Sequence, residues 1–491
     1  MTTVFSAFER TAAAHGGKPF LEMPAWQLRL SYADALTRVC DIAKRYRARG
    51  YRPGHRVALH LETRPEFLLH FLALNSLGIA VLPLNPDYRA AELEYVLGHS
   101  EASLVVAKEN LENPAQAPRP GNAKECALLY TSGTTGKPKG CLLSNFYFLN
   151  LGQRYLDEGG LCAVRPGEDR LITPLPLFHM NALAVSTTAM ILSGGCLIQL
   201  DRFHPRTWWR DVAESGATIV HYLGVMPAIL NNQAEALYQK QHHVRFGYGA
   251  NANPKDHAAF EERFGFPLVE AWAMTETGGG ALIAASREPR HLGTRCIGFP
   301  RPGLEVLIDE NQELLVRQGG ADPRRGFFSG YLKEDEATAH AWRDGWFHTG
   351  DSVRRGPDGS LHFVDRLKNI IRRAGENIAA LEVEAALAGH PDIGQVAVIA
   401  VPDSVRDEEV MACVVLQDKK EKSRATALSI QDWCLERLAY FKAPGHVAFV
   451  DSLPTTATNK VQKAKLADFA FNAADSFDLR ERKKRTAAKS V

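Results

Sequence analysis

The chain has 491 residues, of which 45% are hydrophobic and 23% are charged, and its formal net charge is +2. This length is sufficient for two or more domains with a large buried core. The near balance of acidic and basic residues argues against a nucleic-acid-binding surface, so no nucleic-acid partner is expected. The eight cysteines are scattered and include no C-x-x-C pair, which argues against a zinc knuckle and is typical of a reducing cytoplasm.

The sequence indicates neither a targeting segment nor a stable membrane anchor. The N-terminal stretch MTTVFSAFERTAAAHGG lacks a basic start followed by a long apolar run, so no signal peptide is predicted. Residues 171–200 carry no Asp, Glu, Lys or Arg, but prolines and glycines interrupt them, which predicts buried core instead of a membrane span. Residues 480–489 contain six basic side chains and are predicted to form a solvated, frayed tail.

Short apolar runs separated by helical patterns fill the first half of the chain. Such runs read as buried strands, and they occur at 57–61, 79–84, 103–107, 126–130, 170–173, 196–200, 217–223 and 266–272. The run EFLLHFLALNSLG, between the first two strands, reads as a helix. Apolar strands that alternate with helices predict an α/β fold of parallel sheets with helices packed on their faces.

Residues 130–140, YTSGTTGKPKG, form a loop suited to a polyphosphate. Glycines let the backbone approach a ligand closely, hydroxyl side chains add donors, and lysines add positive charge. These residues are Gly133, Gly136 and Gly140, then Thr131, Ser132, Thr134 and Thr135, and finally Lys137 and Lys139. The spacing does not fit G-x-x-x-x-G-K-[ST], and a Gly/Thr-rich surface turn is the alternative. Ser144 is predicted to cap the helix that follows.

The loop resembles the phosphate loop of the adenylate-forming superfamily, which includes acyl-CoA ligases, peptide-synthetase adenylation domains and beetle luciferases. Other segments resemble that family's remaining motifs in the same order: PLPLFH at 174–179, HYLGVMP at 221–227, YGAN at 248–251, WAMTETGG at 272–279, DGWFHTGD at 344–351 and LPTTATNKVQK at 453–463. The resemblance covers about residues 5–468. The runs VPDSVRDEEV and YFKAP resemble bacterial crotonobetaine/carnitine–CoA ligases more than luciferases.

The resemblance implies a site for ATP and Mg²⁺. Trp272 would stack on adenine beside the turn Gly249-Ala250-Asn251, and Thr275 would donate to the α-phosphate. The full set of residues implied to bind ATP or AMP is Thr131, Ser132, Gly133, Thr134, Thr135, Gly136, Lys137, Gly249, Ala250, Asn251, Trp272, Thr275, Asp351 and Arg366. Asp351 would accept the ribose hydroxyls with Arg366 close by.

Three residues are implied to take part in the chemistry. Glu276 would coordinate Mg²⁺ through a hard carboxylate oxygen. Lys460 is the implied catalytic lysine, although Asn459 replaces the glycine that usually precedes it. Asparagine tolerates a positive φ better than most residues, so the turn can still form. His179 would line the acid channel near the reacting carboxylate.

The acid pocket is implied to lie around the same segments. Its predicted lining is His179, His221, Tyr222, Leu223, Val225, Met226, Ala273 and Met274. In acetate-specific relatives a second tryptophan occupies the position of Ala273 and closes the pocket. The alanine here therefore predicts an acid larger than acetate: medium-sized or branched, cyclic or aromatic.

The predicted domains are residues 1–367, which bind ATP and acid and include a small barrel-like part, and residues 368–491. The second is a smaller, mobile α+β domain that carries Lys460. Its predicted elements are helices at 379–389 and near 428–439 and strands at 394–401, 411–416 and 447–450. Lys368 is the implied hinge, and the predicted contacts of coenzyme A are Arg372, Arg373, Gly375 and Lys442.

The implied reaction is ATP-dependent activation of a small-molecule carboxylic acid to an acyl-adenylate, with release of pyrophosphate, followed by transfer to coenzyme A. One alternative is an adenylating enzyme that loads a separate carrier protein. Another is a catalytically silent binding protein of the same fold, which the presence of Lys460, Glu276, Asp351 and Arg366 argues against. A cytoplasmic location is expected, and association into a homodimer is left open.

Overall fold

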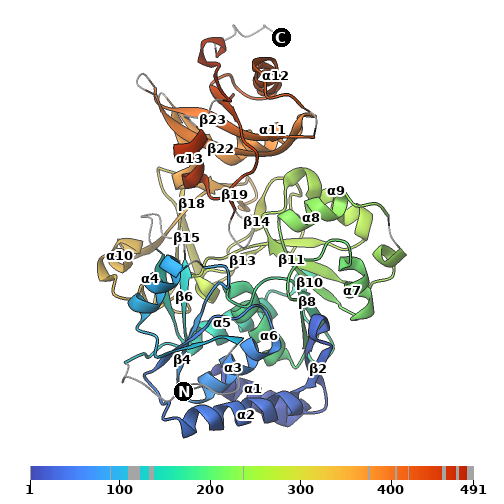
Figure 1. The fold of residues 1–491 in the computed structure, drawn as a ribbon, viewed down its shortest axis with the longest axis vertical. Helices are drawn as coiled ribbons and strands as arrows, with labels where there is room; N and C mark the ends of the chain where they lie inside the picture. The colour runs from blue at the N-terminus through green and yellow to red at the C-terminus, as the bar shows by residue number, and fades with distance from the viewer. Residues whose placement is uncertain are drawn as a thin grey trace. The chain divides into compact units, whose positions relative to one another are not determined.

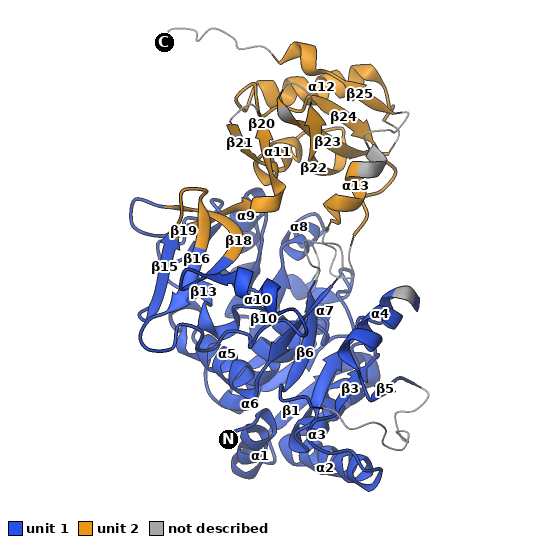
Figure 2. Cartoon of the chain, turned by 90° about the vertical axis from the view of Figure 1, so that its left-hand side faces the viewer, with its two compact units in different colours: residues 1–307, 315–348, 356–361 blue, residues 308–314, 349–355, 362–491 orange. Residues whose placement is uncertain are grey.

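The computed structural model describes residues 2–88, 90–108, 122–131, 138–235, 237–373, 376–403, 406–418, 420–455, 461–470 and 475–483. Figure 2 colours two compact units of this chain. Unit 1 comprises Met1–Leu307, Leu315–His348 and Gly356–Leu361, and unit 2 comprises Ile308–Leu314, Thr349–Arg355 and His362–Val491. The domain division expected between residues 367 and 368 stays a prediction.

An eight-stranded sheet in the order β13-β12-β11-β10-β8-β9-β1-β2 lies at the centre of unit 1 (Figure 1). Its strands are β1 Pro19–Met23, β2 Leu28–Ser31, β8 Arg170–Thr173, β9 Cys196–Gln199, β10 Ile219–Leu223, β11 Phe246–Ala250, β12 Leu268–Trp272 and β13 Ile283–Ala284. Strands β9, β8, β10, β11 and β12 pair in parallel, whereas β2 and β13 are antiparallel edge strands.

A second sheet of unit 1 has five strands in the order β5-β3-β4-β6-β7. These are β3 Arg56–Leu59, β4 Ala80–Pro83, β5 Leu104–Val106, β6 Ala127–Thr131 and β7 Lys139–Leu143. The buried strands β3 and β4 are apolar because helices cover both faces of a parallel sheet. The strands predicted from apolar runs in both sheets are confirmed. Strands β1, β2, β7, β11 and β13 were not among those predictions.

Helices connect the strands of unit 1. They are α1 Val4–His15, α2 Tyr32–Ala48, α3 Pro65–Ser76, α4 Ala90–Ser100, α5 Asn145–Asp157, α6 Thr187–Ser193, α7 Trp208–Glu214, α8 Val225–Asn231, α9 Pro254–Phe264 and α10 Asp335–Ala341. Ser144 caps α5 as predicted, because its side chain accepts a hydrogen bond from the Tyr147 N–H.

Different helices cover the two faces of the large sheet. Figure 1 shows α5 and α6 on one side of β8, β10 and β11, and α7, α8 and α9 on the other. Residues 171–200, predicted to be buried core, form β8, α6 and β9, and most of their side chains are buried. No helix in the described part of the chain is both long enough and apolar enough to cross a membrane.

A third sheet has six strands and contains residues of both units. Its order is β14-β19-β18-β16-β15, with β17 paired to β18. The bounds are β14 Cys296–Gly298, β15 Leu304–Ile308, β16 Glu313–Gln318, β17 Trp342–Arg343, β18 Trp346–Arg355 and β19 Leu361–Arg366.

The remainder of unit 2 is an α+β structure, as predicted. Its sheet has the order β21-β20-β23-β24-β25, with β22 paired to β23. The elements are β20 Ile370–Arg373, β21 Glu376–Ala379, α11 Ala380–Leu387, β22 Ile393–Asp403, β23 Asp407–Leu416, α12 Arg424–Leu435, β24 His446–Phe449, α13 Lys463–Ala470 and β25 Ser476–Asp478. The α12 helix begins earlier than predicted because Ser423 caps it by accepting from the Thr426 N–H.

The first residues of the basic C-terminal stretch are ordered, so the prediction of a frayed tail is wrong for residues 480–483. Arg480–Arg482 form a short 3₁₀-helix, and Lys483 is buried. The Lys483 ammonium pairs with the fully buried carboxylate of Glu409, which also accepts from Arg373 Nε at 2.8 and 2.9 Å. Burial lowers the pKa of Lys483 to about 8, although Glu409 favours the charged form.

This triad predicts a strong effect of Glu409 on stability. Glu409→Ala leaves two buried cations without their anion, so the free energy of unfolding of unit 2 should fall by about 3–5 kcal/mol. Urea denaturation followed by circular dichroism would measure this. Glu436→Ala is the control, because the Glu436–Arg437 pair is exposed and should contribute less than about 1 kcal/mol. Equal effects of the two substitutions would contradict a stabilising role of the buried triad.

Candidate functional site

The carboxyl ends of β10, β11 and β12 meet at one edge of the large sheet. Tyr222 pairs in register with Gly249, and Gly249 pairs with Glu270, so these residues lie in one row across three parallel strands. Ligands of open α/β sheets bind outside this edge of the strands. The fold therefore brings together the predicted Gly249-Ala250-Asn251 turn and the predicted Trp272, which ends β12 and is 6% exposed.

Gly249 is required by packing against Tyr222. A Cβ at position 249 would lie 2.3 Å from the Tyr222 carbonyl oxygen and 2.7 Å from the Tyr222 ring. The ring therefore crosses over β11 where a side chain is missing, and the Tyr222 hydroxyl donates to Glu270 Oε1 on β12 at 2.7 Å. The space beside Gly249 that the sequence assigned to adenine is occupied, on the Cβ side, by Tyr222.

The turn after β11 is held from two sides. Asn251 has a φ of 65°, and its backbone N–H donates to Glu270 Oε2 at 2.8 Å. The Asn251 carbonyl lies against Gly224, where an added Cβ would be only 1.7 Å from the carbonyl oxygen. The Asn251 side-chain amide is exposed and is therefore the group of this residue best placed to meet a ligand.

His221 and Tyr222, both predicted in the acid pocket, lie on opposite faces of β10 because successive strand residues alternate. Tyr222 packs with Met226 and Leu230 in the core beneath α8 and α9. His221 is fully buried on the α5 side, where its Nε2 is 3.1 Å from the Tyr155 hydroxyl. A pocket on one face of the sheet can thus use only one of these two side chains.

A buried polar cluster surrounds His221. Its Nδ1 lies 2.9 Å from Ser186 Oγ and 3.1 Å from Asn181 Oδ1. Both partners belong to the π-helical segment Asn181–Ser186, a type of distortion frequent at functional sites. Burial lowers the pKa of His221 to about 3, so the ring is neutral at physiological pH. Its hydrogen bonds are satisfied within the protein.

The other predicted pocket residues differ in exposure. His179 is half-buried and precedes the π-helical segment. Leu223 is half-buried at the end of β10, and Val225 is 39% exposed at the start of α8. Met226 is buried in the core. Ala273 and Met274 are half-buried immediately after β12.

Glu276 lies close to the strands that flank the predicted phosphate loop. Its Oε1 accepts a hydrogen bond from the Tyr331 hydroxyl at 2.9 Å, and Lys139 Nζ lies 5.2 Å from the centre of the Tyr331 ring. Thr131 pairs with Lys139 in the antiparallel β6–β7 ladder. Ser132, Gly133, Thr134, Thr135, Gly136 and Lys137, predicted in the loop itself, lie outside the described residues.

The residues present suit Mg²⁺ carried mainly by a substrate. In the described ranges no group of three or more His, Cys, Asp or Glu side chains could hold a metal ion. Mg²⁺ commonly uses one or two carboxylates and completes its shell with phosphate oxygens and water. The Glu276 carboxylate, 7% exposed and oriented by Tyr331, fits that limited role. The Thr275 carbonyl accepts from the Tyr147 hydroxyl at 2.8 Å, which fixes the neighbouring backbone.

Unit 2 brings together Asp351 and Arg366, the predicted ribose-binding pair. Arg366 Nε is 2.5 Å from Asp351 Oδ1, and the Asp351 side chain is almost fully buried. Lys368, the predicted hinge, lies in the 3₁₀ turn Leu367–Asn369. Its pKa is lowered by burial and by the nearby Arg366. The catalytic role of Lys460 stays a prediction, since that residue lies outside the described ranges.

The predicted coenzyme A contacts are placed unequally. Arg372 is exposed, whereas Arg373 is buried and bonded to Glu409. Lys442 Nζ is 2.6 Å from Glu382 Oε1, and Gly375 lies outside the described residues. Arg372 is therefore the arginine of this pair that can meet a phosphate without losing a buried ion pair.

Sequence reasoning did not identify Tyr331 or Glu270. Tyr331 is 55 positions from Glu276 in the chain, and Glu270 is 48 positions from Tyr222. A carboxylate inside the otherwise apolar strand run at 266–272 was the signal available for Glu270, because a buried charge needs hydrogen-bond donors. For Tyr331 the sequence offers no comparable signal.

Comparison with known families and proteins identifies relatives over most of the chain. Residues 8–125 and 107–321 match the model of the AMP-binding enzyme family, and residues 382–460 match that of the AMP-binding enzyme C-terminal domain. The crotonobetaine/carnitine–CoA ligase of Salmonella paratyphi A is 29% identical, over 89% of this chain and 92% of the relative. The sulfoacetate–CoA ligase of Cupriavidus necator is 30% identical, over 94% and 96%.

A solved structure of an ATP-bound RpMatB–BxBclM chimera resembles the whole chain. It has a TM-score of 0.82 and 25% sequence identity, and the match covers 95% of this chain and 98% of the other. The fold class predicted from the sequence is thereby confirmed.

The packing of Tyr222 over Gly249 predicts the cost of a side chain at that position. Gly249→Ala should lower the free energy of unfolding by about 1–3 kcal/mol, because the new methyl group overlaps the Tyr222 ring and carbonyl. Gly17→Ala is the matched control, since a Cβ there meets nothing within 4 Å, and its effect should stay within about 1 kcal/mol. Chemical denaturation measures both, and an equally stable Gly249→Ala protein would show that the ring can move aside.

Proposed function

Since this chain belongs to the AMP-binding enzyme family, we propose that it is an ATP-dependent carboxylate–CoA ligase. The product would be an acyl-CoA thioester, released with AMP and pyrophosphate. The observation that carries the proposal is the extent of the match: a CoA ligase 30% identical to this chain aligns with 94% of it. Both family models match, including the one that covers residues 382–460.

The first step joins two anions. A carboxylate oxygen attacks the α-phosphorus of ATP, and the bond from that phosphorus to the pyrophosphate oxygen breaks. Lys139, Lys460 and the N–H groups of the 131–137 loop would neutralise charge as it develops on the phosphates. Mg²⁺ held by Glu276 and the phosphates would supply further charge neutralisation. Because the substrate is itself the nucleophile, the step needs no protein nucleophile.

Nucleotide recognition would use residues at the carboxyl ends of the strands and in unit 2. Trp272 and the turn Gly249-Ala250-Asn251 would hold adenine, and Thr275 would donate to the α-phosphate. Asp351, paired with Arg366 at 2.5 Å, offers its carboxylate to the ribose hydroxyls. These roles follow from the motifs, and for Trp272 and the turn Gly249-Ala250-Asn251 the support is their position at the carboxyl ends of β11 and β12.

The second step transfers the acyl group to coenzyme A. The thiolate attacks the acyl carbonyl, a carbon–sulfur bond forms, and AMP leaves with the oxygen of the mixed anhydride. We assign the hinge between the steps to Lys368, in a 3₁₀ turn where few residues need to change their dihedral angles. Arg372 and Lys442 would meet the phosphates of coenzyme A, with Gly375 near its pantetheine arm.

The acid is proposed to be larger than acetate. Ala273 leaves open the space that a tryptophan closes in acetate-specific relatives, and Met274 beside it is an adaptable apolar side chain. His179 would lie close to the reacting carboxylate. A medium-sized, branched, cyclic or aromatic carboxylate fits this lining.

A carrier protein is the alternative acceptor of the acyl group. Free coenzyme A is favoured because the named relatives at 29–30% identity are CoA ligases over almost their full length. We propose a cytoplasmic location, because all eight cysteines are free thiols. Association into a homodimer stays a prediction.

Pyrophosphate release tests the reaction. We expect release that requires ATP, Mg²⁺ and a carboxylate, and a thioester that forms only with coenzyme A. Lys460→Ala should lower adenylation by several kcal/mol of transition-state stabilisation, roughly 100-fold or more in rate. The same variant should still convert a supplied acyl-adenylate to the thioester, because Lys460 acts on the phosphates of ATP.

The two half-reactions separate the possible outcomes. If Lys460→Ala impairs both equally, the assigned role is wrong. Carboxylate-dependent pyrophosphate release without any CoA thioester would instead favour a carrier protein as acceptor.

The size of the acid pocket is tested at Ala273. The wild type should prefer butyrate, hexanoate, octanoate or benzoate to acetate, gaining roughly 1 kcal/mol of transition-state binding for each buried methylene until the pocket is full. Ala273→Trp should remove that preference because the indole fills the channel. The measurement is kcat/KM for each acid, and an unchanged profile in the tryptophan variant would show that position 273 does not set the pocket depth.

A further inference from the structure

We infer that Glu270 and Tyr222 are positioning residues for nucleotide recognition: together they fix the Ala250–Ala252 turn against the end of β12. Neither is expected to touch the reacting atoms. The inference rests on the proposed function, because it assumes that this turn and Trp272 meet the adenine of ATP.

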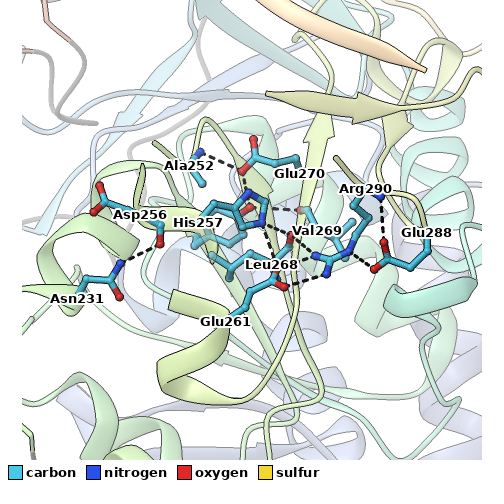
Figure 3. Close-up of polar contacts among 11 residues, drawn as sticks. Asn231, Ala252, Asp256, His257, Glu261, Leu268, Val269, Glu270, Glu288 and Arg290 are labelled. Atoms are coloured by element: carbon cyan, nitrogen blue, oxygen red, sulfur yellow. Dashed lines mark hydrogen bonds and ion pairs between the residues drawn. The ribbon is translucent and has the colours of Figure 1, made fainter. Parts of the chain in front are cut away.

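Three donors from two parts of the chain converge on the Glu270 carboxylate. Oε1 accepts from the Tyr222 hydroxyl at 2.7 Å and from the Ala252 N–H at 3.0 Å. Oε2 accepts from the Asn251 N–H at 2.8 Å. Figure 3 draws the bond from Ala252 to Glu270, above a separate cluster that contains Glu261, Arg290 and Glu288. The carboxylate thus joins β10, the turn after β11, and β12.

Glu270 is held by hydrogen bonds and not by a salt bridge. In the described part of the chain Glu270 has no ion-pair partner, and its side chain is buried. Burial raises its pKa, while Tyr222, Ala252, Asn251 and the nearby His257 favour the ionised form. Backbone N–H groups can only donate, so the two bonds from the turn require an acceptor at both carboxylate oxygens.

Two glycines let neighbouring groups pack closely against the turn, and this packing restricts its conformation. The Tyr222 ring reaches Glu270 because Gly249 has no side chain, and the Asn251 carbonyl fits against Gly224. Asn251 adopts a φ of 65°, a conformation that costs a non-glycine residue energy unless its surroundings impose it. The hydrogen bond from the Asn251 N–H to Glu270 Oε2 is a polar contact that holds Asn251 in this conformation.

The Glu270 carboxylate also links the turn to the strand that carries Trp272. Glu270 is two positions before Trp272 on β12, where Glu270 pairs with Gly249 of β11 and Trp272 pairs with Ile283 of β13. Holding the Asn251 and Ala252 N–H groups on Glu270 therefore sets the separation between the turn and the indole. That separation decides how well a flat base fits between them, and so Glu270 controls adenine affinity through backbone placement.

Glu270→Gln tests this directly with nearly unchanged volume. A glutamine presents one oxygen and one NH₂ group, so at least one backbone N–H of the turn faces another donor. We expect KM for ATP to rise about tenfold, with KM for the acid and for coenzyme A unchanged within about twofold. The ratio of kcat/KM for ATP to kcat/KM for GTP should fall by a similar factor, because the displaced turn distinguishes adenine from guanine less well.

Tyr222→Phe is the milder variant. It removes one donor and leaves both backbone bonds to Glu270, so KM for ATP should rise by about threefold. This variant keeps the aromatic packing over Gly249 and serves as the test if Glu270→Gln does not fold.

Glu261→Gln is the control, because Glu261 on α9 bonds to the other end of β12. Glu261 is half-buried and accepts from Arg290 at 2.6 and 2.8 Å and from the Leu268 N–H at 2.8 Å. It should lower the melting temperature without changing KM for ATP. If Glu270 has a purely structural role, Glu270→Gln should behave like Glu261→Gln: its melting temperature should fall, while its KM for ATP and its preference for ATP over GTP in kcat/KM should stay unchanged.

Calorimetric titration with ATP separates failure of this inference from failure of the proposed function. A wild-type protein that binds no ATP would overturn the proposed function itself. A wild type that binds ATP, together with variants at 270 and 222 that bind it equally well, would overturn only the positioning role. Weaker ATP binding in both variants, with the acid and coenzyme A unaffected, supports it.

Discussion

The buried carboxylate of Glu270, which has no ion-pair partner among the described residues, constrains the edge of the large sheet where β10, β11 and β12 end. Removing Glu270 from water is unfavourable unless donors replace its hydration. The chain supplies them from a tyrosine on one strand and from two backbone N–H groups of a turn. Because each donor has a fixed attachment, satisfying the carboxylate also fixes the relative positions of three strand ends. Trp272 and the turn at Asn251, which are proposed to bind the adenine of ATP, lie at those strand ends.

In unit 2 a buried carboxylate is compensated by cationic side chains. Glu409 is fully buried and is compensated by Arg373 and Lys483, which come from a hairpin strand and from the C-terminal stretch. Breaking such a pair costs more than forming it contributes, because the remaining charge stays buried. The last described residues are therefore part of the structure of unit 2, whereas in unit 1 neutral donors do the corresponding work around Glu270.

Much of the fold could be predicted because buried parallel strands contain short continuous apolar runs, as in β3, β4 and β8. Strand β11 was not predicted, because its sequence FGYGA contains two glycines. Glycine is required at position 249 because Tyr222 of the neighbouring strand occupies the space of a side chain there. The site motifs and their order could be identified from the sequence because each motif is a contiguous segment. Tyr331 and Glu270 act through partners about fifty positions away, a relation that only the folded chain reveals. Opposite orientations of His221 and Tyr222 follow from strand alternation, which adjacent letters in a motif conceal.

Alternation along β10 has a consequence for redesigning this protein toward other acids. Tyr222 lies on the face of β10 that packs against α8 and α9, whereas His221 lies on the α5 face. A saturation library that randomises both positions would mix effects on the Tyr222–Glu270 contact with effects on the polar cluster around His221. Restricting diversity to His221, and to Ser186 and Asn181 that bond to it, would leave the tyrosine–glutamate contact intact.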